Sequence, residues 1–376
     1  MNKKQTKQFA FGIITICLLV TIYGCLKTSN GLNNNSIIET PYYLFFSDSV
    51  GAIYNTSDGI KINKLSLSPD GKPCRALCVS GNNIIFAKDD LYVSDNFGVN
   101  YNHSYDSLRS IHTTAINGLP MNINQSIIVD IPQWHSVYTV TNDPGSNNWL
   151  GIAYNYRHGA TGYWTTDSYY DTASATMPTS MPVKLSTLAL LKSNTLCGYD
   201  PFQNRYFYKK DTLYGWDEST YNFASGGAPS APPALDTTNS FYTYGHYNNE
   251  LIAIDTKGLK GASYSDDLGA TWTPFTGLPA HTPLLSINSP FEELCLIGTD
   301  SMGVYILNAN THAFQPSNNG LPTNAVVYGI AGKQNLYKNG VTQRYIYLAT
   351  NKGLYQSKDN GLDWILVMPG KFTAIY

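Results

Sequence analysis

The sequence predicts an all-β fold built from one repeated unit of short strands. Two copies of an S-x-D-x-G-x-x-W motif, at 265–272 and 357–364, each lie between stretches that are typical of strands. A Gly-Leu-Pro triplet precedes several apolar strands. It occurs at 118–120, 277–279 and 320–322. Past Thr40 the sequence has abundant Tyr and Gly and no long amphipathic helical pattern, which favours strands over helices.

The motif belongs to a longer unit made of an apolar strand, a turn, a second strand and then the motif. The clearest copy is "RYIYLATNKGLYQSKDNGLDW" at 344–364. Six other segments align with it, starting at Tyr43, Asn83, Trp149, Arg205, Glu250 and Leu294. Residues 41–376 divide into seven units of 48 residues, which is enough for four strands and their turns. A repeat of this length with several short strands is typical of a β-propeller.

The two ends of the repeat region predict how such a ring closes. The first unit lacks an inner strand, because "YYLFF" at 42–46 begins it directly, whereas "KFTAIY" at 371–376 is one strand left over. Pairing the two would remove two unpaired sheet edges, which are a liability of β-proteins. We therefore predict a seven-bladed β-propeller whose ring is closed by the C-terminal strand.

The motif resembles the Asp-box, or bacterial neuraminidase repeat, of sialidases, sortilin-type domains, xyloglucanases and photosystem assembly factors. Two of the seven copies are complete: Ser265, Asp267, Gly269 and Trp272, then Ser357, Asp359, Gly361 and Trp364. A third copy is close, with Ser94, Asn96, Gly98 and Tyr101. A weaker one keeps Thr165 and Asp167 but has Tyr169 where the glycine belongs.

The chemistry of the motif is that of a turn. Ser and Asp side chains bond backbone donors, glycine supplies a positive φ, and the Trp covers the turn. Such a turn joins the third and fourth strands of a blade, so it shares one face with the first-to-second turns. We predict that the motif is structural and carries no catalysis. The resemblance implies that enzymes of this superfamily work on the opposite face, among the second-to-third loops and the links between blades.

A sialidase-like site, as the resemblance implies it, needs an arginine triad, a Tyr nucleophile, a Glu that activates it and an Asp acid. None of the five arginines is in an Arg-Ile-Pro motif, and Glu39 precedes the ring. The other glutamates fall on or near turns of the motif face: Glu218, Glu250, Glu292 and Glu293. The sequence thus argues against sialidase activity. Paired aspartates could still hydrolyse glycosides, although such residues usually form turns. The candidates are Asp130, Asp171, Asp255 and Asp300.

Aromatic and Arg residues, which are enriched in binding hot spots, gather in two segments assigned to the face opposite the motif. Trp134 and His135 end a long link at 102–135, and further links run over 172–194 and 222–238. A second-to-third loop, "YNYRHGATG", adds Tyr156, Arg157 and His158. We predict a binding site there. The alternative is that these side chains only cover the end of the ring.

The N-terminus predicts secretion and a lipid anchor. Three lysines and an apolar run precede Cys25, and "IYGC" at 22–25 resembles the bacterial lipobox, which implies cleavage before Cys25 and acylation of its thiol. The alternative, a transmembrane anchor, needs about 20 apolar residues, and this run is short. The predicted organisation is a signal peptide at 1–24, a flexible tether at 25–40 and the propeller at 41–376. No Asp follows Cys25, so we expect an outer-membrane lipoprotein.

Charge and cysteine usage exclude several classes of partner. Cleavage removes three lysines and no acid, so the net charge goes from −2 to −5, and no basic face for nucleic acid is present. No Cys/His pair has zinc spacing, and we expect no metal, no cofactor and no disulfide framework. The predicted function is that of a non-catalytic, lipid-anchored envelope protein that binds a protein or a glycan. Two alternatives remain open: a glycan-active hydrolase with an unrecognised aspartate site, and an assembly factor or scaffold.

Overall fold

A computed structural model describes part of the 376-residue chain. The described residues are 38–40, 42–67, 71–74, 76–80, 83–87, 91–94, 96–103, 125–131, 136–142, 152–157, 163–166, 187–191, 196–200, 205–209, 217–218, 242–269 and 271–376. Cys25 and the apolar run before it lie outside them. Within these ranges no helix is long and apolar enough to cross a membrane.

The chain divides into two compact units. Unit 1 comprises residues 1–42 and 334–343, and unit 2 comprises 43–333 and 344–376. In unit 1, β1 (Ile38–Thr40) pairs antiparallel with the end of β25 at Leu336 and Tyr337. Residues 38–40 were predicted to belong to a flexible tether. That assignment is wrong for these three residues, because their backbone groups find partners on β25.

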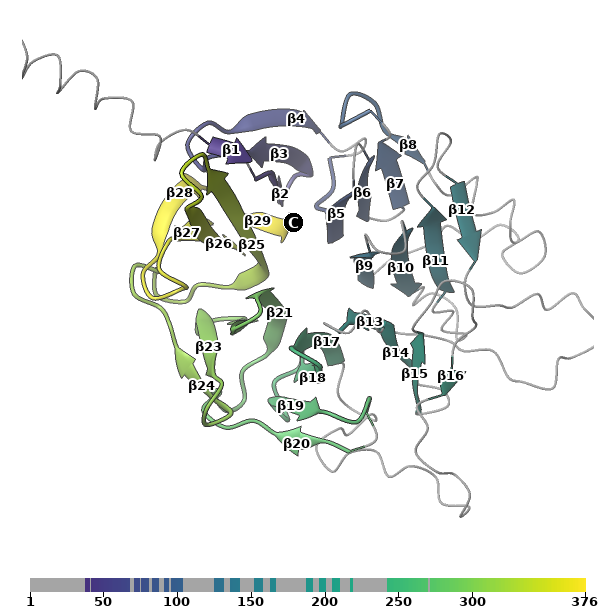
Figure 1. Cartoon of the computed structure of the whole chain (residues 1–376), viewed down its shortest axis with the longest axis vertical. Coiled ribbons are helices and arrows are strands. Elements are labelled where there is room, and N and C mark those ends of the chain that lie inside the picture. The colour runs from purple at the N-terminus through teal and green to yellow at the C-terminus, as the bar shows by residue number, and fades with distance from the viewer. Residues whose placement is uncertain are drawn as a thin grey trace, which may run out of the picture. The chain divides into compact units, whose positions relative to one another are not determined.

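The described strands form seven antiparallel sheets, numbered here in chain order (Figure 1). Sheet 1 contains β29 (Phe372–Ile375), β2 (Leu44–Asp48), β3 (Ala52–Thr56) and β4 (Asn63–Leu67). Sheet 2 contains β5 (Ala76–Ser80), β6 (Asn83–Ala87), β7 (Leu91–Ser94) and β8 (Asn102–His103). Sheet 3 contains β9 (Gln125–Ile131), β10 (Ser136–Asn142), β11 (Ile152–Arg157) and β12 (Tyr163–Thr166). Sheet 4 contains β13 (Thr187–Leu190), β14 (Leu196–Asp200), β15 (Arg205–Lys209) and β16 (Asp217–Glu218).

The remaining three sheets follow the same order. Sheet 5 contains β17 (Tyr242–Tyr247), β18 (Glu250–Asp255), β19 (Ala262–Ser265) and β20 (Thr273–Pro274). Sheet 6 contains β21 (Leu284–Phe291), β22 (Leu294–Thr299), β23 (Val304–Asn308) and β24 (Ala313–Pro316). Sheet 7 contains β25 (Val327–Tyr337), β26 (Thr342–Thr350), β27 (Gly353–Ser357) and β28 (Ile365–Pro369), with β1 beside β25.

The C-terminal strand completes sheet 1, as the leftover strand predicted. Within unit 2, β29 pairs antiparallel with β2, with Ile375 opposite Phe46. The ring of Phe372 meets that of Phe46 edge to face at 5.2 Å. Because β29 is the first strand of sheet 1, this sheet has the same four-stranded order as the others although its strands come from both ends of the chain.

The first strands of successive sheets contact one another throughout unit 2. The contacting pairs are β29 with β5, β5 with β9, β9 with β13, β13 with β17 and β17 with β21. From β21, Ser286 Oγ donates to the Val327 carbonyl of β25 at 3.0 Å. A side chain on Gly329 of β25 would clash with Ile375 of β29, since its Cβ would lie 2.8 Å from Ile375 Cγ2. The apolar core lies between facing sheets, as between sheets 5 and 6 around Ile252, Ile297 and Phe314.

The Gly-Leu-Pro triplets mark the links between sheets, as predicted. Gly277 follows β20 and Gly320 follows β24, and both have a positive φ of 83° and 84°. Each lies against the backbone of the next sheet: a Cβ on Gly277 would be 2.0 Å from the Phe314 oxygen, and one on Gly320 would be 2.1 Å from the Trp364 oxygen. Glycine is required here on both counts. Gly118 lies outside the described residues.

Sheets 3 and 4 differ from the predicted strand order. The segment from Trp149 was expected to hold the second and third strands of its blade, but it supplies the third and fourth, β11 and β12. The segment from Arg205 is displaced in the same way, because β15 is the third strand of sheet 4. The reason in sheet 3 is that residues 125–131, assigned to a link, form β9, the first strand. The apolar alternation in these units marks strands without marking their place in the sheet.

Candidate functional site

The three clearest motif copies adopt one hydrogen-bonded turn, which we call the box turn. In sheet 5, Ser265 Oγ donates to Asp267 Oδ1 at 2.7 Å and accepts from the Gly269 amide at 2.7 Å. The Thr271 amide donates to the same carboxylate oxygen at 2.8 Å. The copies in sheets 2 and 7 repeat these contacts through Ser94, Asn96 and Gly98, and through Ser357, Asp359 and Gly361.

The glycine of each box turn has a positive φ, as predicted: 89° at Gly98, 94° at Gly269 and 91° at Gly361. All three turns join the third and fourth strands of their sheets. We call this side of each sheet, which also carries the first-to-second connections, the box edge. The motif is a structural turn in all three sheets, because its polar side chains are occupied by the backbone of the turn.

Sheet 1 has a shortened box turn that the sequence alignment missed. Thr56 Oγ1 donates to Asp58 Oδ1 at 3.2 Å and accepts from the Gly59 amide at 2.9 Å. The signal was Thr-x-Asp-Gly, one residue shorter than the motif. The weak copy at Thr165 and Asp167 is wrong, because Thr165 is on β12, the fourth strand of sheet 3, and no turn to a fourth strand can follow it.

The described part of the chain includes two of the predicted binding residues, which lie at the box edge of sheet 3 and not at the predicted edge. Tyr156 and Arg157 are on β11, with Arg157 paired to Ser136 of β10. Ser136 also pairs with Ile131 of β9. The prediction of a second-to-third loop was wrong because β9 was not recognised as a strand. Trp134, His135 and His158 lie outside the described residues.

The candidate aspartates do not form a described catalytic pair. Asp255 is fully buried, and its carboxylate accepts hydrogen bonds from the amides of Lys257, Leu259 and Lys260 at 2.6–2.8 Å. It is a turn former, which was the alternative interpretation. Asp300 is exposed in the next sheet. Asp171 and the side chain of Asp130 lie outside the described part of the chain.

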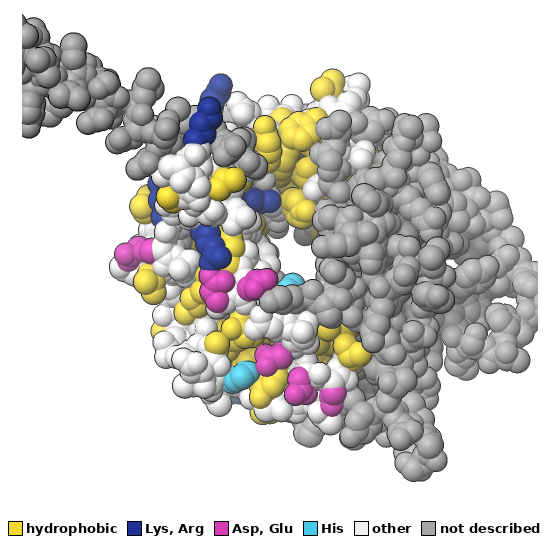
Figure 2. Space-filling view, in the orientation of Figure 1, with side chains coloured by type: hydrophobic (Ala, Val, Ile, Leu, Met, Phe, Trp, Pro, Cys, Tyr) yellow, Lys and Arg dark blue, Asp and Glu magenta, His cyan; other side chains and the backbone are white. Residues whose placement is uncertain are grey.

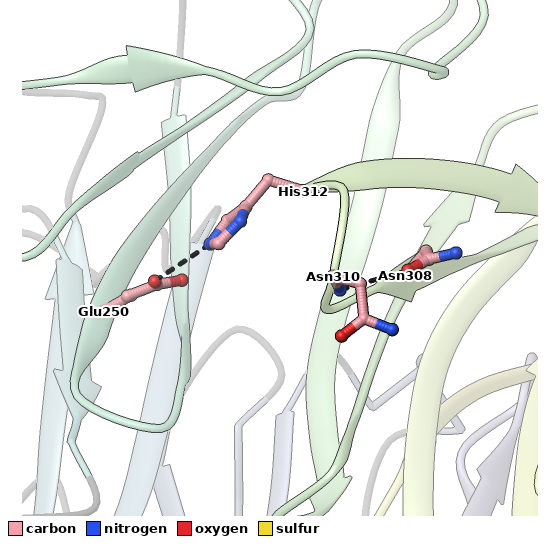
Figure 3. Close-up of polar contacts among 4 residues, drawn as sticks. All are labelled: Glu250, Asn308, Asn310 and His312. Atoms are coloured by element: carbon pink, nitrogen blue, oxygen red, sulfur yellow. Dashed lines mark hydrogen bonds and ion pairs between the residues drawn. The ribbon is translucent and has the colours of Figure 1, made fainter.

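A different pair of ionisable side chains bridges sheets 5 and 6 at the box edge (Figure 3). Glu250 begins β18, directly after the first-to-second turn of sheet 5, and His312 ends the third-to-fourth turn of sheet 6. The Nε2 of His312 lies 3.1 Å from Oε1 of Glu250. His312 has a φ of 47°, a left-handed backbone conformation that residues other than glycine seldom adopt. The turn of β23 and β24, with the Asn310 amide bound to Asn308 Oδ1, presents the imidazole to the neighbouring sheet.

Glu250 keeps one unused acceptor. Its Oε2 is buried, and no donor among the described residues reaches it. A buried carboxylate oxygen without a donor loses hydration without compensation, which costs about 1–3 kcal/mol or more for a charged group. This oxygen is therefore an open acceptor within the described part of the chain.

The surroundings of the pair are aromatic and contain no activated thiol. The imidazole of His312 stacks on Tyr264 with ring centroids 4.9 Å apart, and Phe275 lies further along the same stack at 6.3 Å. The pKa of Cys295 is raised to about 12, mainly by burial and less by the charge of Glu250, while a Ser289 hydrogen bond acts in the opposite direction. Cys295 is therefore a neutral thiol.

Acidic side chains gather on the same face around this pair. Figure 2 shows them in the part of the view where Figure 1 has β18 to β24. The exposed acidic residues at the box edge of sheets 5 and 6 are Asp266, Glu292 and Glu293, and Glu293 forms an ion pair with Arg344. No group of His, Cys, Asp and Glu with the geometry of a metal site occurs in the described ranges.

The sequence placed Glu250 correctly at a turn of the box edge but gave it no role. Its partner is 62 residues away on the next sheet, so no local motif joins the two. Only the box-edge position of this glutamate could be predicted from the repeat.

No family model matches the chain, and no curated protein does. Solved structures match at low identity. YCF48 bound to D1 peptide is 12% identical with a TM-score of 0.48, and the match covers 84% of this chain and 91% of that one. The extracellular domain of the hybrid two-component system BT3049 from B. thetaiotaomicron is 15% identical with a TM-score of 0.49, over 80% of this chain and 35% of that one. The GH74 enzyme of Niastella koreensis is 12% identical with a TM-score of 0.37, over 88% of this chain and 63% of that one.

Proposed function

We propose that this chain is a non-catalytic, lipid-anchored envelope protein whose closed seven-bladed β-propeller carries Asp-box turns and binds a protein or a glycan. The fold part of the proposal is supported by the seven sheets of the described strands, by the successive contacts of their first strands and by the pairing of β29 with β2. The lipid anchor at Cys25, and a place in the outer membrane, rest on the N-terminal sequence.

The contact of Glu250 with His312 carries the binding part of the proposal. It brings an unused carboxylate oxygen, a half-exposed imidazole and an aromatic stack to one point between two sheets. A change of the His312 rotamer opens Glu250 to a ligand that offers hydroxyl or N–H donors. Sugar hydroxyls and peptide or amine N–H groups have this chemistry, and aromatic and imidazole faces add stacking. The binding edge is therefore the box edge, in place of the opposite face.

Binding is tested with a glycan array and an envelope pull-down on the wild type, Glu250→Gln and His312→Gln. We expect both variants to fold with a melting temperature near that of the wild type and to lose binding about ten-fold, the effect of one charged hydrogen bond. Asp300→Asn is the matched control, because it removes an exposed carboxylate from the opposite edge of sheet 6. Binding that survives both variants, or falls equally in the control, contradicts the site.

The remaining alternatives have their own readouts. Release of reducing sugar ends from an array ligand, abolished by a single Asp→Asn change, would establish a hydrolase instead. Lipidation is tested separately with a fatty-acid analogue, which should label the wild type and not Cys25→Ser. Equal labelling of both would contradict the anchor.

A further inference from the structure

The most exposed large apolar side chains of the described residues share one position of the box turn. Ile60 is 86% exposed, Val99 is 74% exposed and Leu362 is 64% exposed. Each directly follows the turn glycine: Gly59 in sheet 1, Gly98 in sheet 2 and Gly361 in sheet 7. The equivalent residue of sheet 5, Ala270, lies outside the described residues. We call the three side chains the apolar tips.

The hydrogen bonds of the box turn hold these tips outward. The Ile60 amide donates to Asp58 Oδ1 at 2.8 Å, and the Leu362 amide donates to Asp359 Oδ1 at 3.1 Å. In both turns the carboxylate accepts hydrogen bonds from backbone amides of the turn. The apolar side chain next to it is therefore left directed away from the turn. An aliphatic group held in water at a rigid turn gains about 25 cal/mol for each Å² that a partner covers.

The three sheets that carry the tips are neighbours in unit 2. Gly329 of sheet 7 lies against Ile375 of sheet 1, and β2 and β29 of sheet 1 contact β5 of sheet 2. The box turns of sheets 1 and 2 are also close, because a Cβ on Gly98 would lie 3.3 Å from Leu65 Cδ1 of β4. The tips therefore occupy the same position of the turn on the box edges of three neighbouring sheets. We call this arrangement of Ile60, Val99 and Leu362 the row.

Unit 2 begins at the box edge of sheet 1. Tyr43 precedes β2 and is half exposed, with its ring 6.1 Å from Phe97 of the box turn in sheet 2. The start of β2 is at the box edge, since the Phe45 amide donates to the Tyr376 carbonyl just after β29. Cys25 is 18 residues before Tyr43, a length that reaches about 60 Å at most when fully extended.

We propose that the apolar tips Ile60, Val99 and Leu362 dock on the lipid surface to which the N-terminus is attached. This proposal rests on the proposed lipid anchor for the nearness of the membrane. The occupant is a bilayer because unit 2 begins, at Tyr43, on the box edge that carries the tips, 18 residues after the proposed anchor at Cys25.

The turns that carry the tips hold charges of both signs. Lys61 follows Ile60 and Lys358 is in the turn of Leu362, whereas Asp58, Asp359 and Asp363 are in the same turns. Sheets 5 and 6, by contrast, carry Asp266, Glu292 and Glu293 at this edge. Docking through sheets 7, 1 and 2 leaves the site of Glu250 and His312 in water and available to a ligand.

The test places a tryptophan at each tip in turn: Ile60→Trp, Val99→Trp and Leu362→Trp. Leu259→Trp and Met302→Trp are the matched controls, because these residues are 55% and 48% exposed in second-to-third turns at the opposite edge. The protein is purified from cells as processed and mixed with vesicles of three parts phosphatidylethanolamine and one part phosphatidylglycerol, with and without brominated acyl chains. The emission added by each new tryptophan is obtained by subtracting the wild type.

We expect brominated lipid to quench the tip tryptophans about two-fold, the behaviour of side chains at about 5–10 Å depth in the interface, and to leave the controls unquenched. A triple Ile60→Ser, Val99→Ser, Leu362→Ser variant should need about ten-fold more lipid for half-maximal flotation, whereas Leu259→Ser with Met302→Ser should not. Quenching at neither tips nor controls, or equally at both, overturns the proposal. Self-association of the wild type that the triple variant abolishes, without tip quenching, would assign the row to a second copy instead.

This outcome is separable from the lipid anchor. Fatty-acid labelling at Cys25 without tip quenching overturns docking and leaves the anchor. Tip quenching without labelling overturns the anchor and leaves docking.

Discussion

The indole Nε1 of Trp364 donates a hydrogen bond to the carbonyl of Ser317, 47 residues earlier, at 2.8 Å. Ser317 lies beyond β24 of sheet 6, so the box turn of sheet 7 is fastened to the preceding sheet. In sheet 5 the indole of Trp272 instead donates to Gly269 of its own turn at 3.0 Å. Among the described residues, the indole at this motif position thus bonds to the preceding sheet in one case and to its own turn in the other.

This difference predicts unequal costs of removing the two indoles. Both are buried, and truncating a buried Trp costs about 3–5 kcal/mol. We expect Trp364→Ala to reach the upper end of that range and Trp272→Ala the lower end, measured by urea unfolding. Trp364→Phe and Trp272→Phe are the controls, since they keep most of the ring and lose the donor. A larger loss for Trp272→Ala would contradict the inter-sheet role.

Gly320 should tolerate no side chain. Its φ of 84° disfavours L residues, and a Cβ would lie 2.1 Å from the Trp364 oxygen. We expect Gly320→Ala to lower stability by about 3 kcal/mol or more, above the cost of a left-handed alanine alone. Gly340→Ala is the control, because Gly340 also has a positive φ of 81° but a Cβ there would have nothing within 4 Å. Equal losses would mean that backbone strain alone accounts for the effect.

Removing residues 370–376 should unfold or aggregate unit 2. The deletion takes away β29, uncovers the edge of β2 and removes the buried ring of Phe372 from Phe46. Circular dichroism and light scattering would follow the loss. Lys371→Ala, which changes one exposed side chain of the same segment, should leave the melting temperature unchanged. A truncated chain that melts like the wild type would show that sheet 1 does not need its first strand.

Lys333 should make stability rise with pH in the alkaline range. It is on β25 with its Nζ 4.7 Å from the ring centroid of Tyr376. Burial lowers its pKa to about 8, against a smaller opposite effect of Cys78. Below pH 8 the ammonium is charged in both states and its burial costs stability. Between about pH 8 and 10.5 the unfolded chain binds a proton that the folded chain does not, so the free energy of unfolding rises with pH.

We therefore expect Lys333→Met to stabilise the protein at pH 7 by about 1–3 kcal/mol and to flatten its stability between about pH 8 and 10.5. The measurement is urea unfolding of both proteins at several pH values. Lys371→Met is the control. Because Lys371 is exposed, this variant should keep the rise of the unfolding free energy with pH. If the unfolding free energies of the wild type and of Lys333→Met changed with pH in parallel, the lowered pKa of Lys333 would be contradicted.

Features that depend on short stretches of chain could be predicted from the sequence. Ser265, Asp267 and Gly269 specify their turn because the hydrogen bonds of Ser265 and of the Thr271 amide fall within seven residues. The leftover strand at 371–376 predicted the first strand of sheet 1, because an unpaired strand at each end of a repeat has one natural partner. Gly277 and Gly320 marked the links between sheets, since their conformation is local.

Features that depend on contacts between neighbouring sheets could not be predicted from the sequence. Arg157 was assigned to the wrong edge, because alternation reports that a segment is a strand and not whether it is third or second in its sheet. The contact of Glu250 with His312 spans 62 residues, and that of Trp364 with Ser317 spans 47. Neither leaves a local pattern. The exposure of Ile60, Val99 and Leu362 likewise required the fold, because an apolar residue after a turn glycine is buried or exposed according to what the next sheet places over it.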